Sequence, residues 1–227
     1  MKETTIWITF HQTELIERYN LKEDETFKLF KGNNLNIKGE NINHLNPFYS
    51  ELTTLYWVYR NNIRSKYVGF CHYRRQFTQI VAFEPTVCQV YQITSFQSSL
   101  FEQYKLAHNY NDLYDIIDIL NEWYGKENNY SKYLFLGKTF IPFCSFIMHY
   151  DDFIKLCDFL FPILFAYDKK NNLNMNPDNY WKKAERDFRY SRTHYQCRAI
   201  AFLAERLISA YIIFNMRPFA IQTINNY

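Results

Sequence analysis

Hydrophobic residues along the chain form short continuous runs, which alternate with segments of helical spacing. Residues 4–10 (TTIWITF) are β-branched and aromatic, and this pattern predicts a first buried strand. A second strand is predicted within residues 67–77 (YVGFCHYRRQF) and a third over residues 140–149 (FIPFCSFIMH). Residues 81–93 alternate in a strand-like way, with a break at Pro85.

A helix is predicted between the first two strands, over residues 46–61. Asn46 is the expected N-cap, Pro47 the first helical residue, and Glu51 lies in the first turns. Strand, helix, strand is the α/β pattern, with a right-handed crossover as the default. Further helices are predicted over residues 98–107, 111–124, 152–166 and 196–214. Loops are predicted over residues 21–40, with one short element at most, and 168–178, and a short closing strand or tail over 217–224.

Composition narrows the class of protein. The 227 residues are 48% hydrophobic, which predicts a single compact core, and the net charge of +3 is weaker than nucleic-acid binding usually requires. The 20 Tyr and 21 Phe fit either a sugar or nucleotide binder or an AT-rich genome, and codon bias is the simpler explanation. Five dispersed cysteines argue against a disulfide framework or zinc site. We see no secretion signal and no membrane span, and expect a cytoplasmic protein.

Two adjacent arginines stand at the exit of the second predicted strand, in the order His72, Tyr73, Arg74, Arg75. Ligands of α/β sheets usually bind at strand ends, and a guanidinium fits phosphate oxygens bidentately. Near the N-terminus of the helix at Pro47, the pair would make a diphosphate cradle that needs no metal. Alternatively, both arginines are solvated loop residues. On an extended strand they would face opposite sides.

Carboxylates are natural general bases for deprotonating a hydroxyl. The candidates by position are Glu51, Asp151, Asp152 and Glu205. Glu205 interrupts an apolar helix and is followed by Arg206, so it is either buried and paired or functional. Helical spacing places Arg198 and Glu205 on nearly the same side of the helix, and a structural ion-pair network is an equal alternative.

Two single histidines, His11 and His44, fall at the cleft-side ends of predicted elements. Neither has a partner at metal-ligand spacing, and such histidines are more often simply hydrogen-bonded polar groups.

Residues 180–198 concentrate cations among aromatic side chains, against only Glu185 and Asp187. This tract fits a stacking surface for single-stranded nucleic acid, a segment on anionic lipid head groups, or an ordinary solvated helix. Its cations are Lys182, Lys183, Arg186, Arg189, Arg192 and Arg198, and its aromatic residues include Trp181, Phe188, Tyr190 and Tyr195.

Three long motifs occur in order at residues 41–61 (NINHLNPFYSELTTLYWVYRN), 67–77 (YVGFCHYRRQF) and 202–212 (FLAERLISAYI). Together they resemble the bacterial capsular and exopolysaccharide biosynthesis proteins long filed as a domain of unknown function and regarded as glycosyltransferases. The resemblance runs from Thr4 to about Phe214. One departure is Gln12 after His11, where the family usually has Lys. The matching positions are Asn41, Asn46, Pro47, Tyr49, Glu51, Leu52, Tyr56, Trp57, His72, Tyr73, Arg74, Arg75, Glu205 and Arg206.

The resemblance implies a single GT-A-like nucleotide-sugar-binding domain over residues 1–227, an α/β fold with a mixed central sheet flanked by helices. It implies transfer of a hexose, galactofuranose among the candidates, from a UDP-sugar to a lipid-linked or oligosaccharide acceptor, with peripheral contact at the inner face of the cell membrane. Most GT-A enzymes bind a divalent metal through Asp-x-Asp, and CHYRR stands in the corresponding place here. We therefore expect no cofactor, with a divalent metal as the less favoured alternative.

The expected catalytic residue is Glu205 or, failing it, Glu51, with Arg206 and Arg198 in support. The alternative is a non-catalytic carbohydrate- or nucleotide-binding protein of the same fold, and no nucleic-acid partner is expected. The expected donor-binding residues are His11, Asn41, His44, His72, Tyr73, Arg74 and Arg75.

Overall fold

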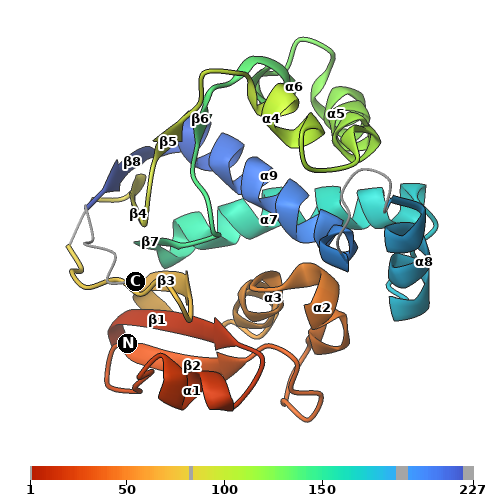
Figure 1. Ribbon diagram of the computed structural model, residues 1–227. Helices are drawn as coiled ribbons and strands as arrows, with labels where there is room; N and C mark the ends of the chain where they lie inside the picture. The colour runs from red at the N-terminus through yellow and green to blue at the C-terminus, as the bar shows by residue number, and fades with distance from the viewer. Residues whose placement is uncertain (1, 82–83, 188–193, 222–227) are drawn as a thin grey trace.

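The computed structural model describes residues 2–81, 84–187 and 194–221. These residues form a six-stranded mixed sheet in the order β2-β1-β3-β7-β4-β8, with helices packed around it, which confirms the expected fold class (Figure 1). A second sheet pairs two short strands. The strands are β1 (Lys2–Phe10), β2 (Phe27–Lys31), β3 (Ser65–His72), β4 (Val87–Val90), β5 (Thr94–Ser95), β6 (Thr139–Phe140), β7 (Phe146–His149) and β8 (Arg217–Ala220).

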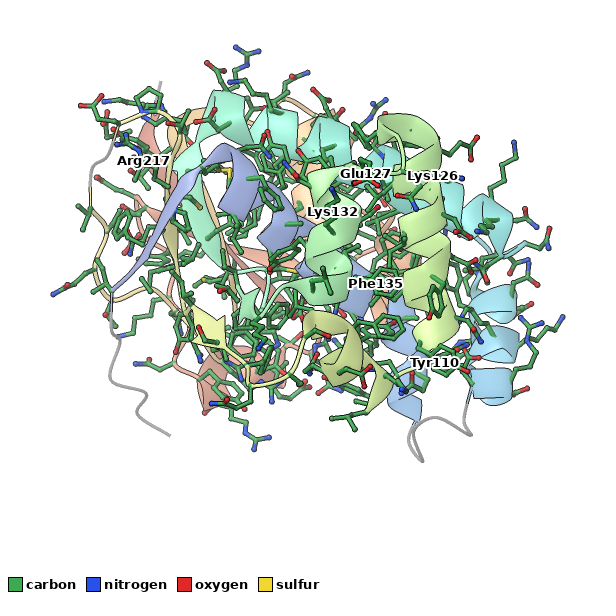
Figure 2. All side chains as sticks on the ribbon, turned by 90° about the horizontal axis from the view of Figure 1, so that it is seen from above. Tyr110, Lys126, Glu127, Lys132, Phe135 and Arg217 are labelled. Carbon is green, nitrogen blue, oxygen red and sulfur yellow. The ribbon has the colours of Figure 1, made fainter. Side chains whose placement is uncertain are left out.

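The helices differ greatly in length, and α7 and α9 are the longest. Figure 1 shows α4, α5 and α6 together in a layer on the far side of α9 from β1. Figure 2 views this layer from above, with Tyr110 near one end of α5 and Lys126 near the other. The helices are α1 (Glu14–Arg18), α2 (Asn46–Tyr49), α3 (Leu52–Arg60), α4 (Leu100–Lys105), α5 (Tyr110–Tyr124), α6 (Asn129–Leu136), α7 (Tyr150–Lys170), α8 (Pro177–Asp187) and α9 (Ala199–Asn215), with 3-10 turns η1 (Asn43–Leu45) and η2 (His194–Arg198).

The strands bury both faces, because alternate side chains enter two different apolar clusters. Val68 and Phe70 of β3 belong to the larger core, which also includes apolar residues of α3, α7 and α9. Tyr67 and Cys71 of the same strand belong to a smaller core with Ile6, on the other face of the sheet. The near-continuous apolar run of β3 is therefore explained by a central position in the sheet.

Strand directions determine which residues meet at the edge where β1 and β3 end. Both β2 and β3 run parallel to β1, on opposite sides of it, so their carboxyl ends share one edge. β7 runs antiparallel to β3 and pairs Tyr67 with His149. The residues after β7, Asp151 and Asp152, therefore lie at the opposite edge. There Asp152 accepts a hydrogen bond from the Thr86 N–H at 2.8 Å.

The helix predicted over residues 46–61 is divided into α2 and α3. Ser50 separates them, with a φ of 50° and a ψ of −125°, which a non-glycine residue rarely adopts. Asn46 is not the N-cap: it is itself helical, and its Nδ2 donates to Ser50 O at 3.1 Å and to Thr53 Oγ1 at 3.2 Å. The side chain thus stabilises the kink, and the kink places Glu51 at the N-terminus of α3.

Other differences arise where local pattern is weak. The predicted loop over residues 21–40 contains the edge strand β2, and α6 lies in a segment for which we predicted nothing. The closing strand is confirmed as β8, parallel to β4. Parts of three predictions lie outside the described residues: 82–83 of the alternating segment, 222–224 of the tail, and 188–193 of the basic tract, which include Phe188, Arg189, Tyr190 and Arg192.

Candidate active site

A cleft lies at the carboxyl ends of β1 and β3 and has two lobes. The first lobe measures about 250 Å³ and the second about 180 Å³. Four residues line both lobes and are called the shared wall: Ser50, Glu51, His72 and Arg198. The first lobe also includes Thr9, Phe10, His11, Asn33, Asn46 and Tyr73. The second also includes Arg74, Arg75, Phe143, Tyr195, Phe202 and Glu205.

The first lobe is built on the end of β1 and on the kinked helix. The Thr9 and Thr54 hydroxyls form a buried hydrogen bond of 2.7 Å that ties β1 to α3. His11 follows β1, and its ring centroid lies 5.7 Å from that of Tyr73. Burial lowers the pKa of His11, and the positive charges of Arg198 and Arg74 lower it further. This lobe therefore combines aromatic surface with a histidine that favours its neutral form.

The two arginines after β3 line the same lobe because the chain turns back on itself there. The Arg75 N–H donates to His72 O at 2.8 Å, and these two residues form an isolated bridge. The alternation of an extended strand is thereby broken, and Arg74 and Arg75 both line the second lobe. The Arg75 guanidinium lies 3.8 Å from the centroid of the Phe143 ring.

His72 is neutral, and its tautomer follows from its contacts. The Arg74 N–H donates to His72 Nδ1 at 3.1 Å, so the proton of the neutral ring lies on Nε2. That Nε2 lies 3.4 Å from Glu51 Oε1. Burial lowers the pKa of His72 to about 3, with Arg74 and Arg75 adding repulsion. The contact with Glu51 is therefore a polar contact to a neutral ring rather than an ion pair.

The shared wall is completed by Arg198, from the end of η2. Its Nε donates to Ser50 Oγ at 2.9 Å, which joins the C-terminal part of the chain to the kink between α2 and α3. Arg198 and Glu205 line the second lobe together, but among the described residues no ion pair joins them. The ion-pair network considered as an alternative for Glu205 is therefore not formed with Arg198.

Glu205 is the carboxylate of the second lobe. Its Oε1 accepts a hydrogen bond from the Phe143 N–H at 3.1 Å. Burial raises the pKa of Glu205 to about 7; Arg206 opposes this shift and Glu51 adds to it. Burial also raises the pKa of Glu51. Glu205 thus titrates near neutral pH, the range in which a carboxylate works best as a general base.

Three predicted site residues lie outside both lobes. Arg206 is buried behind the cleft, where its guanidinium donates to Phe202 O at 2.8 Å and to Gln103 Oε1 at 2.6 Å. His44 is exposed, with Nε2 3.3 Å from Met175 O. Asn41 stabilises its own turn, donating to Gly39 O at 3.0 Å. The structure brings together His11, Glu51, His72, Tyr73, Arg74, Arg75, Arg198 and Glu205.

Sequence reasoning missed Ser50, Asn33 and Phe143 as cleft residues. Phe143 has a φ of 76°, and with Ser50 it is a second non-glycine residue of the cleft at positive φ. Such strained backbone concentrates at functional sites. Serine and phenylalanine do not indicate a positive φ, so no pattern in the sequence could have identified Ser50 and Phe143 as cleft residues.

Among residues 2–81, 84–187 and 194–221, no group of three or more His, Cys, Asp or Glu side chains could hold a metal ion. No helix within these ranges is long and apolar enough to cross a membrane.

The sheet and its cleft define a glycosyltransferase-like fold, and the chain belongs to the family described as Domain of unknown function (DUF4422), which matches residues 19–216. No curated protein matches the chain. A solved structure with the same fold is the apo structure of WbbM, a bifunctional glycosyltransferase, with a TM-score of 0.72 and 20% identity, covering 97% of this chain and 45% of that one. The chain thus spans less than half the length of WbbM, and at this identity the likeness shows the fold.

Proposed function

We propose that this protein is a glycosyltransferase that moves a sugar from a nucleotide diphosphate sugar to a saccharide acceptor. The observation that carries the proposal is the meeting of three guanidinium groups, Arg74, Arg75 and Arg198, with the Glu205 carboxyl in one cleft. The cleft lies at the carboxyl ends of parallel strands, where α/β folds bind nucleotides. The fold shared with WbbM supports the same class of activity.

The nucleoside occupies the first lobe in this proposal, against His11 and Tyr73. Its diphosphate crosses the shared wall, so that Arg198 contacts it from one side and Arg74 and Arg75 from the other. Guanidinium groups form charge-assisted hydrogen bonds with phosphate oxygens, and these are about twice as strong as neutral ones. The donor sugar then projects into the second lobe.

The chemistry is the exchange of one bond at the anomeric carbon for another. The bond from that carbon to the diphosphate oxygen breaks, and a bond to the acceptor oxygen forms. Glu205 Oε accepts the proton of the acceptor hydroxyl, while the arginines stabilise the charge that develops on the leaving diphosphate. Glu51 holds His72 through its Nε2–H. This contact favours Glu205 as the base.

We further propose that the transfer needs no divalent metal, because the three arginines supply the positive charge that a metal supplies in other GT-A enzymes. A chelator then leaves the rate unchanged. A rate that is abolished by chelator and restored by manganese would overturn this part of the proposal. A hexose donor, a lipid-linked or oligosaccharide acceptor of capsular or exopolysaccharide synthesis, and peripheral contact with the cytoplasmic membrane face remain proposals from the family resemblance.

The test is UDP binding followed by hydrolysis of UDP-sugars. UDP raises the melting temperature of the wild type, and Arg74→Ala weakens UDP binding by about tenfold or more, since a hydrogen bond to a charged group contributes about 1.5–3 kcal/mol. The control is Arg18→Ala, which removes an exposed arginine of α1. Equal UDP binding by wild type and Arg74→Ala would refute the diphosphate site.

The second candidate is a non-catalytic nucleotide- or carbohydrate-binding protein of the same fold. The measurement that separates the two candidates is hydrolysis of the sugar donor or transfer of its sugar. Donor hydrolysis that is present in the wild type and lost in Glu205→Gln, with UDP binding intact, identifies the enzyme. UDP binding without hydrolysis or transfer, across a panel of UDP-hexoses and saccharide acceptors, identifies the binding protein.

A further inference from the structure

We propose that the Tyr195 ring is the platform of an acceptor subsite in the second lobe, where it stacks on the apolar face of a neutral pyranose. Tyr195 lines this lobe together with Glu205, and 52% of its surface is exposed. The lobe thus places an exposed aromatic ring in the same pocket as the Glu205 carboxyl. The inference rests on the proposed function, since it takes Glu205 as the base.

Tyr195 is the outer end of a column of rings that begins in the core. The Tyr104 and His108 centroids are 4.7 Å apart, those of His108 and Phe202 are 4.2 Å apart at 29°, and those of Phe202 and Tyr195 are 4.9 Å apart at 37°. The three inner members are buried. Ring contacts of this kind are stabilising beyond area burial, so the platform is held before any ligand arrives.

The chain that follows Tyr195 is held by two side-chain contacts. Gln196 is buried, and its Nε2 donates to Ala107 O at 2.8 Å. The Arg198 guanidinium lies 5.6 Å from the Tyr195 centroid and is itself bonded to Ser50. The orientation of the ring is thus tied to the shared wall.

The groups around the ring match a pyranose. Such a sugar presents C–H groups on one face, which suit an aromatic ring, and hydroxyls at its rim, which need donors and acceptors. Glu205 lines the same lobe and supplies an acceptor for one of these hydroxyls, while Arg74 and Arg75, which line it too, contact the diphosphate. A general base must lie within hydrogen-bond reach of the hydroxyl that it deprotonates, so the acceptor must occupy the lobe that contains Glu205.

The experiment is saturation-transfer NMR with three probes, each added with UDP: methyl β-D-galactopyranoside, methyl α-D-mannopyranoside and uridine. Aromatic protons of the protein are saturated. We expect transfer to the ring C–H protons of at least one pyranoside in the wild type and in Tyr195→Phe. We expect its loss in Tyr195→Ala and in Tyr195→Leu, which retains apolar bulk if the alanine variant fails to fold. Tyr114→Ala removes an exposed tyrosine of α5 outside the cleft and keeps the transfer.

The outcomes separate this subsite from the donor site. No transfer to either pyranoside, or undiminished transfer in the Ala and Leu variants, overturns the inference. The inference is also overturned if saturation is transferred to the base protons of uridine and this transfer is lost in Tyr195→Ala, because the Tyr195 ring would then bind a nucleobase. If UDP shifts the melting temperature and no pyranoside binds, only the acceptor subsite fails. If a pyranoside binds through Tyr195 and UDP does not bind, the subsite stands and the donor assignment fails.

Discussion

Replacing Glu205 with glutamine tests the buried carboxyl in two independent ways. The folded-state pKa of about 7 lies above the ordinary value of 4.5, because burial disfavours the charged form. Between pH 4.5 and 7 the folded protein therefore holds a proton that the unfolded chain has released. The resulting stabilisation is complete below pH 4.5 and is lost as the pH rises through 7. Glutamine keeps the shape of the side chain and its acceptor for the Phe143 N–H, and it cannot ionise.

The pKa difference sets the magnitude. At pH 8 the charged carboxyl destabilises the folded state by on the order of 3 kcal/mol relative to a neutral group, and at pH 5 by less than about 1 kcal/mol. For a chain of this size each kcal/mol corresponds to about 2–4 °C in Tm. Glu205→Gln should therefore raise the Tm by about 6–12 °C at pH 8 and by at most a few degrees at pH 5.

The assays are calorimetric melting at the two pH values and transfer or donor hydrolysis above pH 7. Activity should fall by about 10²–10⁴-fold while Tm increases, since a general base contributes about that factor. Glu102→Gln, which alters an exposed carboxylate of α4, should change neither. A Tm at pH 8 equal to or below that of the wild type would refute the buried-charge argument. Activity within about twofold of the wild type would refute the role as base.

Three further predictions concern the fold and the shared wall. Lys183→Met should lower the unfolding free energy in urea by about 3–5 kcal/mol, because the buried Asp112, 2.7 Å from Lys183 Nζ, loses its cation; an unchanged midpoint would contradict this. Gly69→Ala should destabilise by about 1–3 kcal/mol, since the added Cβ would lie 2.8 Å from a side-chain carbon of β7; a melting curve like that of the wild type would show that β7 can shift. The His72 ring should not titrate between pH 5 and 8 in NMR spectra, because its pKa is lowered to about 3, and a midpoint near 6.5 would contradict its burial.

The sequence predicted those parts of the fold that depend on local pattern. The runs at residues 4–10 and 67–71 are strands because β-branched and aromatic residues suit a buried sheet, and helical spacing identified most of α3, α5, α7 and α9. One short element was allowed within residues 21–40, but its type and bounds were not predicted, because an edge strand such as β2 needs little apolar pattern.

Two kinds of pattern identified residues that line the cleft. Arg74 and Arg75 follow a predicted strand, and Glu205 interrupts an apolar helix. The direction of β7 could not be predicted, because a strand of four residues carries the same pattern whether it is parallel or antiparallel. Since β7 is antiparallel to β3, the candidate bases Asp151 and Asp152 lie at the opposite edge of the sheet from the cleft. The positive φ of Ser50 could not be read either, since it depends on hydrogen bonds from Asn46.

The shared wall links ligand binding in one lobe of the cleft to ligand binding in the other. Ser50, Glu51, His72 and Arg198 border both lobes, and Arg198 is bonded to Ser50 within that wall. A ligand that shifts Arg198 from either side changes the surface offered on the other. By thermodynamic linkage, if one occupant changes the affinity for the second by some factor, the second changes the affinity for the first by the same factor. Binding in the two lobes is therefore coupled to the extent that an occupant shifts Arg198, and a Kd measured for one occupant alone holds only while the other lobe is empty.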